Sequence, residues 1–204
     1  MATQVQSAFQ LVGGHPVLDF ANTLDNRGSD NEIELLASYD DLLRFAEQSG
    51  IISSADRSEL SRAAQKHKQL AGRTLADATV MREAIFQIFH ALTLDQPSPK
   101  SALDQLNTFV HEALAHRFIA PAHDHFHWEW SGTTDNPRWI LWPIAMQAAG
   151  LLTSEDVNNV RSCASENCDW LFLDHSKSHS RRWCDMKVCG NRNKVRRFYE
   201  KQKA

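Results

Sequence analysis

The spacing of apolar residues predicts a mostly helical body over the first 160 residues. Apolar positions recur there at three- and four-residue steps, which places them on one face of a helix. The strongest pattern covers 74–93, where Met81, Ile85 and Ile88 share one stripe. Shorter helices are predicted at 17–24, 38–50, 53–70, 98–114, 143–152 and 154–160.

Residues that cap helix N-termini mark the start of three of these helices. Ser38 and Ser53 each precede an aspartate by three residues, which resembles a capping box. Ser98 precedes Pro99, a residue that suits a first helical turn, so a further cap is predicted there. The inward stripe expected on that helix is Leu103, Leu106, Val110 and Leu114.

The periodicity changes to alternation after residue 117. The segments 118–120 and 126–130 alternate apolar and polar residues as strands do, and 139–142 is a candidate third strand. A small hairpin or three-stranded sheet is therefore expected. The fold class that follows is α+β and mostly α, a helical body with a small β-hairpin or sheet.

All four cysteines lie after residue 160, as Cys163, Cys168, Cys184 and Cys189. They form two Cys-x4-Cys pairs separated by fifteen residues. Two cysteine pairs at about this separation are typical of a four-thiolate zinc site, although two intervening residues are more usual within a pair. One Zn²⁺ bound this way is structural, because four protein ligands leave no open position for a reacting water.

The region after residue 160 is predicted to be a small module of treble-clef type, which divides the chain into 1–160 and 161–204. The first cysteine pair closes a knuckle, a short apolar strand follows, and the second pair lies at the start of a helix from Asn191. So small a module needs its metal for stability. Val195, Phe198 and Tyr199 are expected to form the buried stripe of the last helix.

Charge is distributed unevenly along the chain. From residue 161 onward the formal charge is +6, whereas the preceding residues carry −9. A basic tail on an acidic body favours a polyanionic partner such as DNA, although a merely solvated tail is the alternative. The residues expected to contact phosphates are Arg181, Arg182, Arg192, Lys194, Arg196 and Arg197.

Two other groups of polar residues are candidate sites. Asp19, Asn22 and Arg27 lie near one another on or after the first helix, where they either line a ligand pocket or, as we favour, bond internally. Five histidines lie in or near the predicted strand region, and they offer a possible second metal site because alternate strand residues share a face. These are His111, His116, His123, His125 and His127. Scattered histidines without a metal are the default interpretation, since no His-Glu-x-x-His pattern accompanies them.

Several classes of protein are disfavoured by what the sequence lacks. No apolar run approaches the roughly 18 residues that span a bilayer, so no membrane association is expected. No secretory signal is visible at the N-terminus, which favours a reducing cytoplasm and metal binding over disulfides. No nucleophile elbow, phosphate loop or dinucleotide fingerprint is present, so an enzyme is not expected.

The motifs of both regions resemble those of a known family. Trp183-Cys184-x4-Cys189-Gly-Asn-Arg192 is similar to the CGNR-type zinc finger. The segment Leu18-Asp-Phe-Ala-Asn-Thr23 resembles the opening motif of the ABATE domain that precedes this finger, and 82–85 and 142–145 also fit it. Members of this family are bacterial and are described as stress-induced transcription regulators. The resemblance implies a zinc finger, contact with DNA and no established catalytic activity.

Three functions follow from these observations. The first is a regulator that binds DNA through its finger, with a body that senses a small-molecule effector or forms a homodimer. The second is an RNA-binding or protein-interaction adaptor in which the finger is only a structural staple. The third is an enzyme with a site among Asp19, Asn22, Arg27 and the histidines. No catalytic sequence motif supports this third function.

Overall fold

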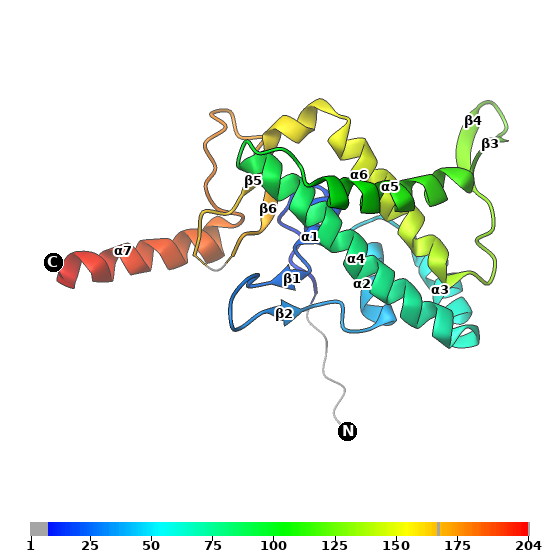
Figure 1. Ribbon diagram of the computed structural model, residues 1–204, viewed down its shortest axis with the longest axis horizontal. Helices are drawn as coiled ribbons and strands as arrows, with labels where there is room; N and C mark the ends of the chain where they lie inside the picture. The colour runs from blue at the N-terminus through cyan, green and yellow to red at the C-terminus, as the bar shows by residue number, and fades with distance from the viewer. Residues whose placement is uncertain (1–7, 167, 204) are drawn as a thin grey trace, which may run out of the picture.

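The computed structural model of the chain describes residues 8–166 and 168–203 (Figure 1). It is mostly helical with three small antiparallel sheets, which confirms the predicted α+β class. The helices are α1 (Pro16–Ala21), α2 (Tyr39–Gln48), α3 (Ser54–Lys66), α4 (Lys68–Thr93), α5 (Lys100–Ala115), α6 (Leu141–Leu152) and α7 (Asn191–Lys203). The strand pairs are β1 (Leu24–Asp25) with β2 (Ile33–Glu34), β3 (Arg117–Pro121) with β4 (Phe126–Trp130), and β5 (Val160–Ser162) with β6 (Leu171–Leu173).

Helix α4 is the central element of the body and contacts α1, α2, α3, α5 and α6 (Figure 1). The core between these helices is apolar, and its largest fully buried side chains include Phe20, Phe45, Phe89 and Trp142. α4 begins at Lys68, several residues before the predicted start, and runs to Thr93. Burial of its apolar stripe against five neighbours supplies most of its stability, as is usual for helices in proteins.

The predicted helix starts are confirmed at α2 and α3 but not at α5. Ser38 and Ser53 accept hydrogen bonds from the backbone N–H groups of Asp41 and Asp56. At α5 the cap is Pro99 without a side-chain bond, so the Ser98 cap is wrong. The buried face of α5 also differs from the predicted one. Alanines contribute to the face that packs against the neighbouring helices, whereas Leu103 and Leu114 are exposed. The buried residues of α5 are Ala102, Leu106, Phe109 and Ala113.

The predicted third strand at 139–142 is wrong. A 3₁₀ turn over Pro137–Ile140 leads directly into α6. The Asn136 side chain accepts the Arg138 N–H at 3.0 Å, and Pro137 occupies the first helical position. Because this apolar run is buried on all sides, its pattern does not distinguish strand from helix. The helix predicted at 154–160 is a short 3₁₀ turn over Glu155–Asn159.

Strands β3 and β4 form the predicted hairpin, which projects from the end of α5 (Figure 1). Its base is attached to the body by aromatic contacts. His116 stacks on Trp142 with ring centroids 3.9 Å apart, and Trp130 lies 5.8 Å from the same ring. The rest of the hairpin extends beyond the helices.

Strands β5 and β6 connect the C-terminal module to the body. Val160, Leu171 and Leu173 belong to the same core as the body helices, and β6 contacts both α1 and α4. The expected domain boundary between residues 160 and 161 falls within β5 and stays a prediction. Helix α7 extends away from the body at the end of the molecule opposite the hairpin (Figure 1).

Candidate metal centre and nucleic-acid interface

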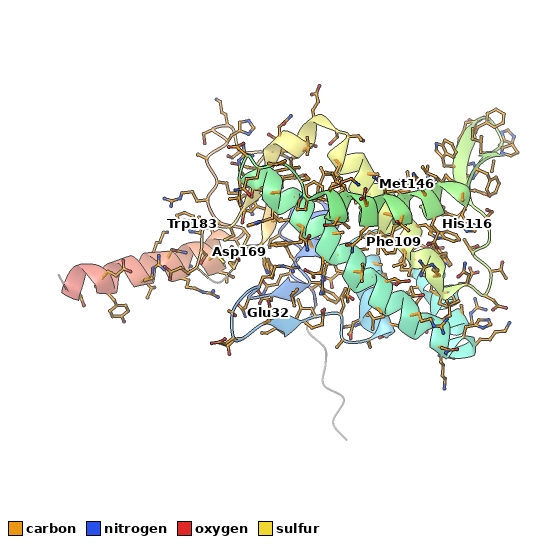
Figure 2. All side chains as sticks on the ribbon, viewed as in Figure 1. Glu32, Phe109, His116, Met146, Asp169 and Trp183 are labelled. Atoms are coloured by element: carbon orange, nitrogen blue, oxygen red, sulfur yellow. The ribbon has the colours of Figure 1, made fainter. Side chains whose placement is uncertain are left out.

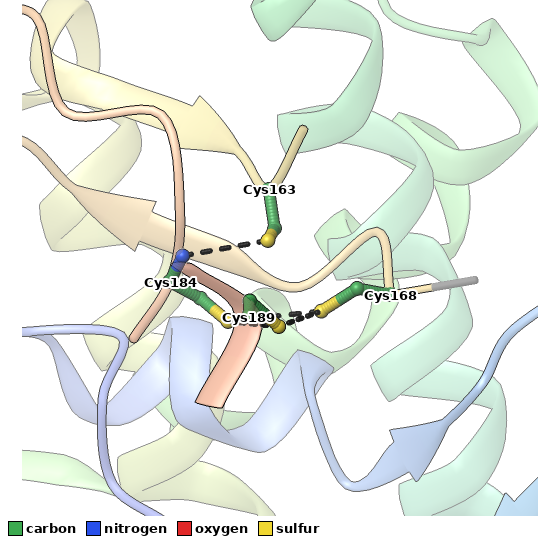
Figure 3. Close-up of side chains that lie close together, drawn as sticks. All are labelled: Cys163, Cys168, Cys184 and Cys189. Carbon is green, nitrogen blue, oxygen red and sulfur yellow. Dashed lines mark hydrogen bonds between the residues drawn. The ribbon is translucent and has the colours of Figure 1, made fainter. Parts of the chain in front are cut away.

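The four cysteines meet at the junction of the β5–β6 loop and the start of α7 (Figure 3). Cys163 follows β5 and Cys168 precedes β6, so the strand pair brings both ends of the first knuckle together. Cys184 lies in the loop after β6, and Cys189 lies in the helical turn Met186–Gly190 that leads into α7. This is the treble-clef-like arrangement that the spacing predicts, with one pair from a hairpin loop and one at a helix start.

The sulfur positions fit one zinc ion. All four Sγ atoms lie within 4.8 Å of one another, and the Cys168, Cys184 and Cys189 sulfurs are mutually separated by 3.6 Å. A tetrahedron with zinc–sulfur bonds of about 2.3 Å requires sulfurs about 3.8 Å apart. All four side chains are buried, and the Cys163 sulfur accepts the backbone N–H of Cys184 at 3.4 Å. The donor set and its spacing are those of a closed, structural site.

Three of the thiols, Cys163, Cys168 and Cys184, influence one another's ionisation. Hydrogen bonds from the Cys168 and Cys184 thiols hold the pKa of the Cys163 thiol well below its usual range. The bond to Cys163 in turn raises the pKa of Cys168 and of Cys184. The negative charge of a Cys163 thiolate therefore opposes ionisation of Cys168 and Cys184. A divalent cation removes this repulsion and allows all four sulfurs to bind as thiolates.

Arg181 supports the second half of the centre from outside the cysteines. Its guanidinium donates to the carbonyl oxygens of Trp183, at 2.9 Å, and of Cys184, and lies 4.3 Å above the ring of Phe172. Asp174, which is fully buried, accepts the backbone N–H of Arg181 at 2.9 Å. Sequence reasoning assigned Arg181 to phosphate contact and gave no role to Asp174, although this aspartate lies directly after an apolar strand and fits the motif of the finger.

A second support links α7 to the first knuckle. Asn193 is buried, and its Nδ2 donates to the Ser165 hydroxyl and to the Cys189 carbonyl oxygen, both at 2.9 Å. The Asp185 side chain caps the turn before α7 by accepting the N–H groups of Lys187 and Val188. The direction of α7 is therefore fixed by residues adjacent to the metal ligands.

Replacement of Arg181 by alanine is expected to weaken zinc binding by about 10- to 100-fold, as loss of an outer-shell partner does in other metal sites. The matched control is Arg182→Ala, because that guanidinium contacts only the ring of Trp183 among these groups, at 5.6 Å. Zinc affinity is measured by competition with a chromophoric chelator. Equal zinc affinity in the two variants would contradict the supporting role of Arg181.

Asp19 and Asn22, two of the predicted pocket residues, bond internally. The Asp19 carboxylate accepts the Gly13 N–H at 2.7 Å. A side chain at Gly13 would lie only 2.9 Å from that oxygen, so a residue without Cβ is required there. Asn22 exchanges two hydrogen bonds with the backbone of Leu171, at 2.9 and 2.8 Å. It therefore ties α1 to β6 and the body to the zinc module.

Arg27, the third pocket candidate, faces a different element. It forms an ion pair with Glu83 on α4, donates to the Ala21 carbonyl oxygen at 3.0 Å and lies 3.9 Å over the ring of Phe86. The three polar residues thus have separate partners on separate elements. A ligand pocket at these residues stays a prediction.

The environment of Asp19 predicts a dependence of stability on pH. Burial raises its pKa to about 6, although the N–H groups of Gly13 and Val12 oppose the shift. Since an unfolded aspartate has a pKa near 3.9, the folded chain keeps a proton between about pH 4 and 6 that the unfolded chain has lost. Native stability therefore falls as pH rises through this window.

Asp19→Asn removes this titration while keeping an oxygen that accepts the Gly13 N–H. The free energy of unfolding of the variant, minus that of the native chain, is expected to be about 1 kcal/mol larger at pH 7.5 than at pH 5, because only the native chain loses stability as Asp19 ionises. Urea unfolding at the two pH values measures the change, with Asp30→Asn on an exposed loop as control. A difference that does not vary with pH would show that Asp19 titrates normally.

The histidines of the hairpin region do not gather around one point. His125 bonds to Asp124 at 2.7 Å, His127 to Glu129 at 2.9 Å, and His116 stacks on Trp142. Among residues 8–166 and 168–203, the four cysteines are the one cluster of three or more metal-ligating groups close enough to share an ion.

The apolar residues of α7 are exposed, which corrects the expectation that they are buried. Val195, Phe198 and Tyr199 are 55%, 59% and 59% exposed, and Figure 2 shows the side chains of α7 directed outward into open space. The helix extends beyond the body, so nothing in the described structure covers this stripe. The amphipathic pattern was real, but it marks a surface rather than a core.

The predicted phosphate-binding residues lie in different environments. Arg192 and Lys194 are exposed on α7, and Arg182 is exposed in the loop before Cys184. Arg196 forms ion pairs with Glu166 and Glu200. The side chain of Arg197 lies outside the described residues.

Comparisons with known proteins agree with this geometry. A family model described as "Putative stress-induced transcription regulator" (ABATE) matches residues 14–155, and the CGNR zinc finger model matches residues 159–202. Neither description names an enzyme. A comparison with curated proteins gives no match. No helix in the described ranges has the length and apolar content that a membrane span requires. Because the first model covers most of the chain and the second accounts for its cysteines, this chain belongs to the ABATE family and ends in a CGNR zinc finger fitted to one structural Zn²⁺.

Proposed function

We propose that the chain is a cytoplasmic, bacterial transcription regulator that binds DNA through its zinc finger and α7. The observation that carries this proposal is the exposed surface of α7, where basic and aromatic side chains lie side by side. Arg192 and Lys194 flank the exposed stripe of Val195, Phe198 and Tyr199. Cations position a protein on phosphates, while apolar and aromatic groups contact sugars and base edges in a groove.

The zinc centre has a structural part in this function. Its four sulfurs leave no ligand position for substrate or water, so the metal acts by fixing the loop and α7. Asn193 and Arg181 hold the helix start and the preceding loop against the cysteines. Arg182 and the α7 residues Arg192 and Lys194 are the leading phosphate contacts in the proposal. Arg196 and Arg197 contribute positive charge to the same region, whereas Arg181 acts mainly through the metal centre.

Binding to a labelled duplex across a salt series tests the proposal. The zinc-loaded chain should bind with log affinity that falls linearly with log salt, since each phosphate contact releases condensed counterions. The slope counts the phosphates engaged, at about 0.9 for each contact. Undetectable binding at low salt would overturn DNA binding as the function.

An adaptor role is the second candidate, and the exposed apolar stripe of α7 favours it. A helix with apolar residues at positions i, i+3 and i+4 also fits a groove on another protein, and its flanking cations suit an RNA or acidic partner. If the duplex does not bind, the same helix should be tested against RNA and then used to capture protein partners.

The body is proposed to sense an effector or to hold two chains together. A groove of about 420 Å³ lies among α2, α3 and α4, and Leu43, Ala64 and Ala71 contribute to its largely apolar lining. Tyr39 also lines the groove, and its hydroxyl donates to the Pro137 carbonyl oxygen at 2.6 Å. A small, mostly apolar molecule is the class of effector that such a groove would accept.

A further inference from the structure

The hairpin formed by β3 and β4 carries a continuous apolar face that the body does not cover. Ile119 is paired with Trp128, and Pro121 with Phe126. Paired residues, and residues two positions apart, lie on the same face of a hairpin, so these four side chains form one surface. Phe126 is 74% exposed, Ile119 60% and Trp128 57%. We call this surface the hairpin face.

The charges around the hairpin face restrict what can cover it. Arg117 shares the face, but its guanidinium lies over Trp130 at 4.2 Å and Trp128 at 5.7 Å, at the base of the hairpin. The hydrogen-bonded pair of His127 and Glu129 lies on the opposite face. The face therefore offers no carboxylate to a basic partner and only one ring-stacked cation to an acidic one.

We propose that the hairpin face is a self-association surface that packs against the same face of a second copy of this chain. A two-fold interface must be complementary to itself, and an apolar face without opposing charges meets that requirement. Two such faces bury Ile119, Phe126 and Trp128 against each other, while the one cation of the face, Arg117 at the base of the hairpin, stays over the rings of its own Trp128 and Trp130.

Packing through the faces is favoured over pairing through a strand edge. Pro121 lacks the backbone N–H that an added strand would need from β3, and proline on an edge strand opposes such pairing. Face-to-face packing of two hairpins also gives each two-stranded sheet the second layer that it lacks, since an isolated hairpin is only marginally stable.

The size of the hairpin face indicates which class of interface it can form. The exposed parts of its side chains amount to roughly 400 Å² per copy, or about 800 Å² in total, given 150–250 Å² for each aromatic. That area is typical of weak, transient complexes rather than obligate dimers. Area alone does not fix affinity, but a contact at the weak, transient end of the range is expected to have a dissociation constant on the order of 10–100 µM.

Sedimentation velocity of the zinc-loaded full chain between about 1 and 200 µM tests the inference, a range that brackets the expected constant. The native chain should shift from monomer to dimer across this range. The double variant Phe126→Ser plus Trp128→Ser should stay monomeric at every concentration. Phe118→Ser, which changes an exposed aromatic on the other face of the same hairpin, should associate like the native chain.

Two results would overturn the inference. One is a native chain that stays monomeric at 200 µM, which would assign the hairpin face to a different partner. The other is a double variant that still dimerises, which would place the contact elsewhere, for example on α7. Ile119→Arg provides a second variant, because like charges brought together across a two-fold interface should also prevent the dimer.

This inference rests on the proposed function, which includes a homodimer, and it assigns the hairpin face as the interface of that homodimer. Its test contains no DNA, so its failure is distinguishable from failure of DNA binding. A chain that dimerises without binding a duplex would keep the hairpin interface and remove the regulator proposal. A chain that binds a duplex but stays monomeric would do the reverse.

Discussion

Replacement of Cys184 by serine is expected to abolish stoichiometric zinc binding and unfold the segment from 174 to the end of α7. Zinc contributes about 10–16 kcal/mol of apparent binding free energy to comparable small modules, and no fifth ligand joins the cluster among the residues that the structure describes. The body should remain folded, because its core includes α1 to α6 and the apolar side chains of β5 and β6. Zinc content and far-ultraviolet circular dichroism measure the two effects.

The native chain treated with a chelator is the control for this variant, and the two should give the same spectrum. Helical signal should fall only by the contribution of α7, which has 13 residues. Complete loss of helical signal would contradict the division into a stable body and a zinc-dependent module. One zinc retained per chain would remove Cys184 from the set of ligands.

The double variant Arg192→Ala plus Lys194→Ala is expected to weaken duplex binding by more than tenfold with zinc content unchanged. Both side chains are exposed on α7 and have no ion-pair partner among the described residues. Loss of two phosphate contacts should reduce the slope of log affinity against log salt by about 1.8. Fluorescence anisotropy across a salt series measures both quantities.

The matched control removes the same charge from the body. Arg62 and Arg73 are exposed on α3 and α4, so Arg62→Ala plus Arg73→Ala changes net charge equally but leaves α7 intact. If both double variants lost affinity to the same extent, binding would depend on overall charge rather than on the surface of α7. Loss of zinc from the α7 variant would instead show that these residues hold the module together.

The metal centre was predictable because its chemistry depends on residue type and spacing. Four cysteines in two pairs leave few alternatives, and the structure brings all of them within 4.8 Å. The supporting residues were not predictable in the same way. Arg181 and Arg182 are adjacent and identical in type, yet only Arg181 turns toward the Cys184 carbonyl oxygen. Which of two neighbouring arginines turns inward depends on loop geometry that the sequence does not state.

The errors in the fold have a common physical cause. Periodicity identifies an apolar stripe, but it does not show whether another element reaches that stripe. Val195, Phe198 and Tyr199 have the spacing of a buried face, yet α7 extends past the body and leaves them exposed. The run at 139–142 is buried on all sides, so every position in it is apolar. Its sequence therefore lacks the alternation of apolar and polar residues that would distinguish a strand from a helix.

The pair of hydrogen bonds between Asn22 and Leu171 makes the two regions thermodynamically dependent on each other. Helix α1 lies in the core of the body, and β6 follows directly from a metal ligand, so this link joins body folding to metal occupancy. By linkage, if zinc binding favours one state of the body, a molecule that binds that state raises the affinity for zinc by the same factor by which zinc raises the affinity for that molecule. An effector bound far from the cysteines would thus change how firmly the finger keeps its metal.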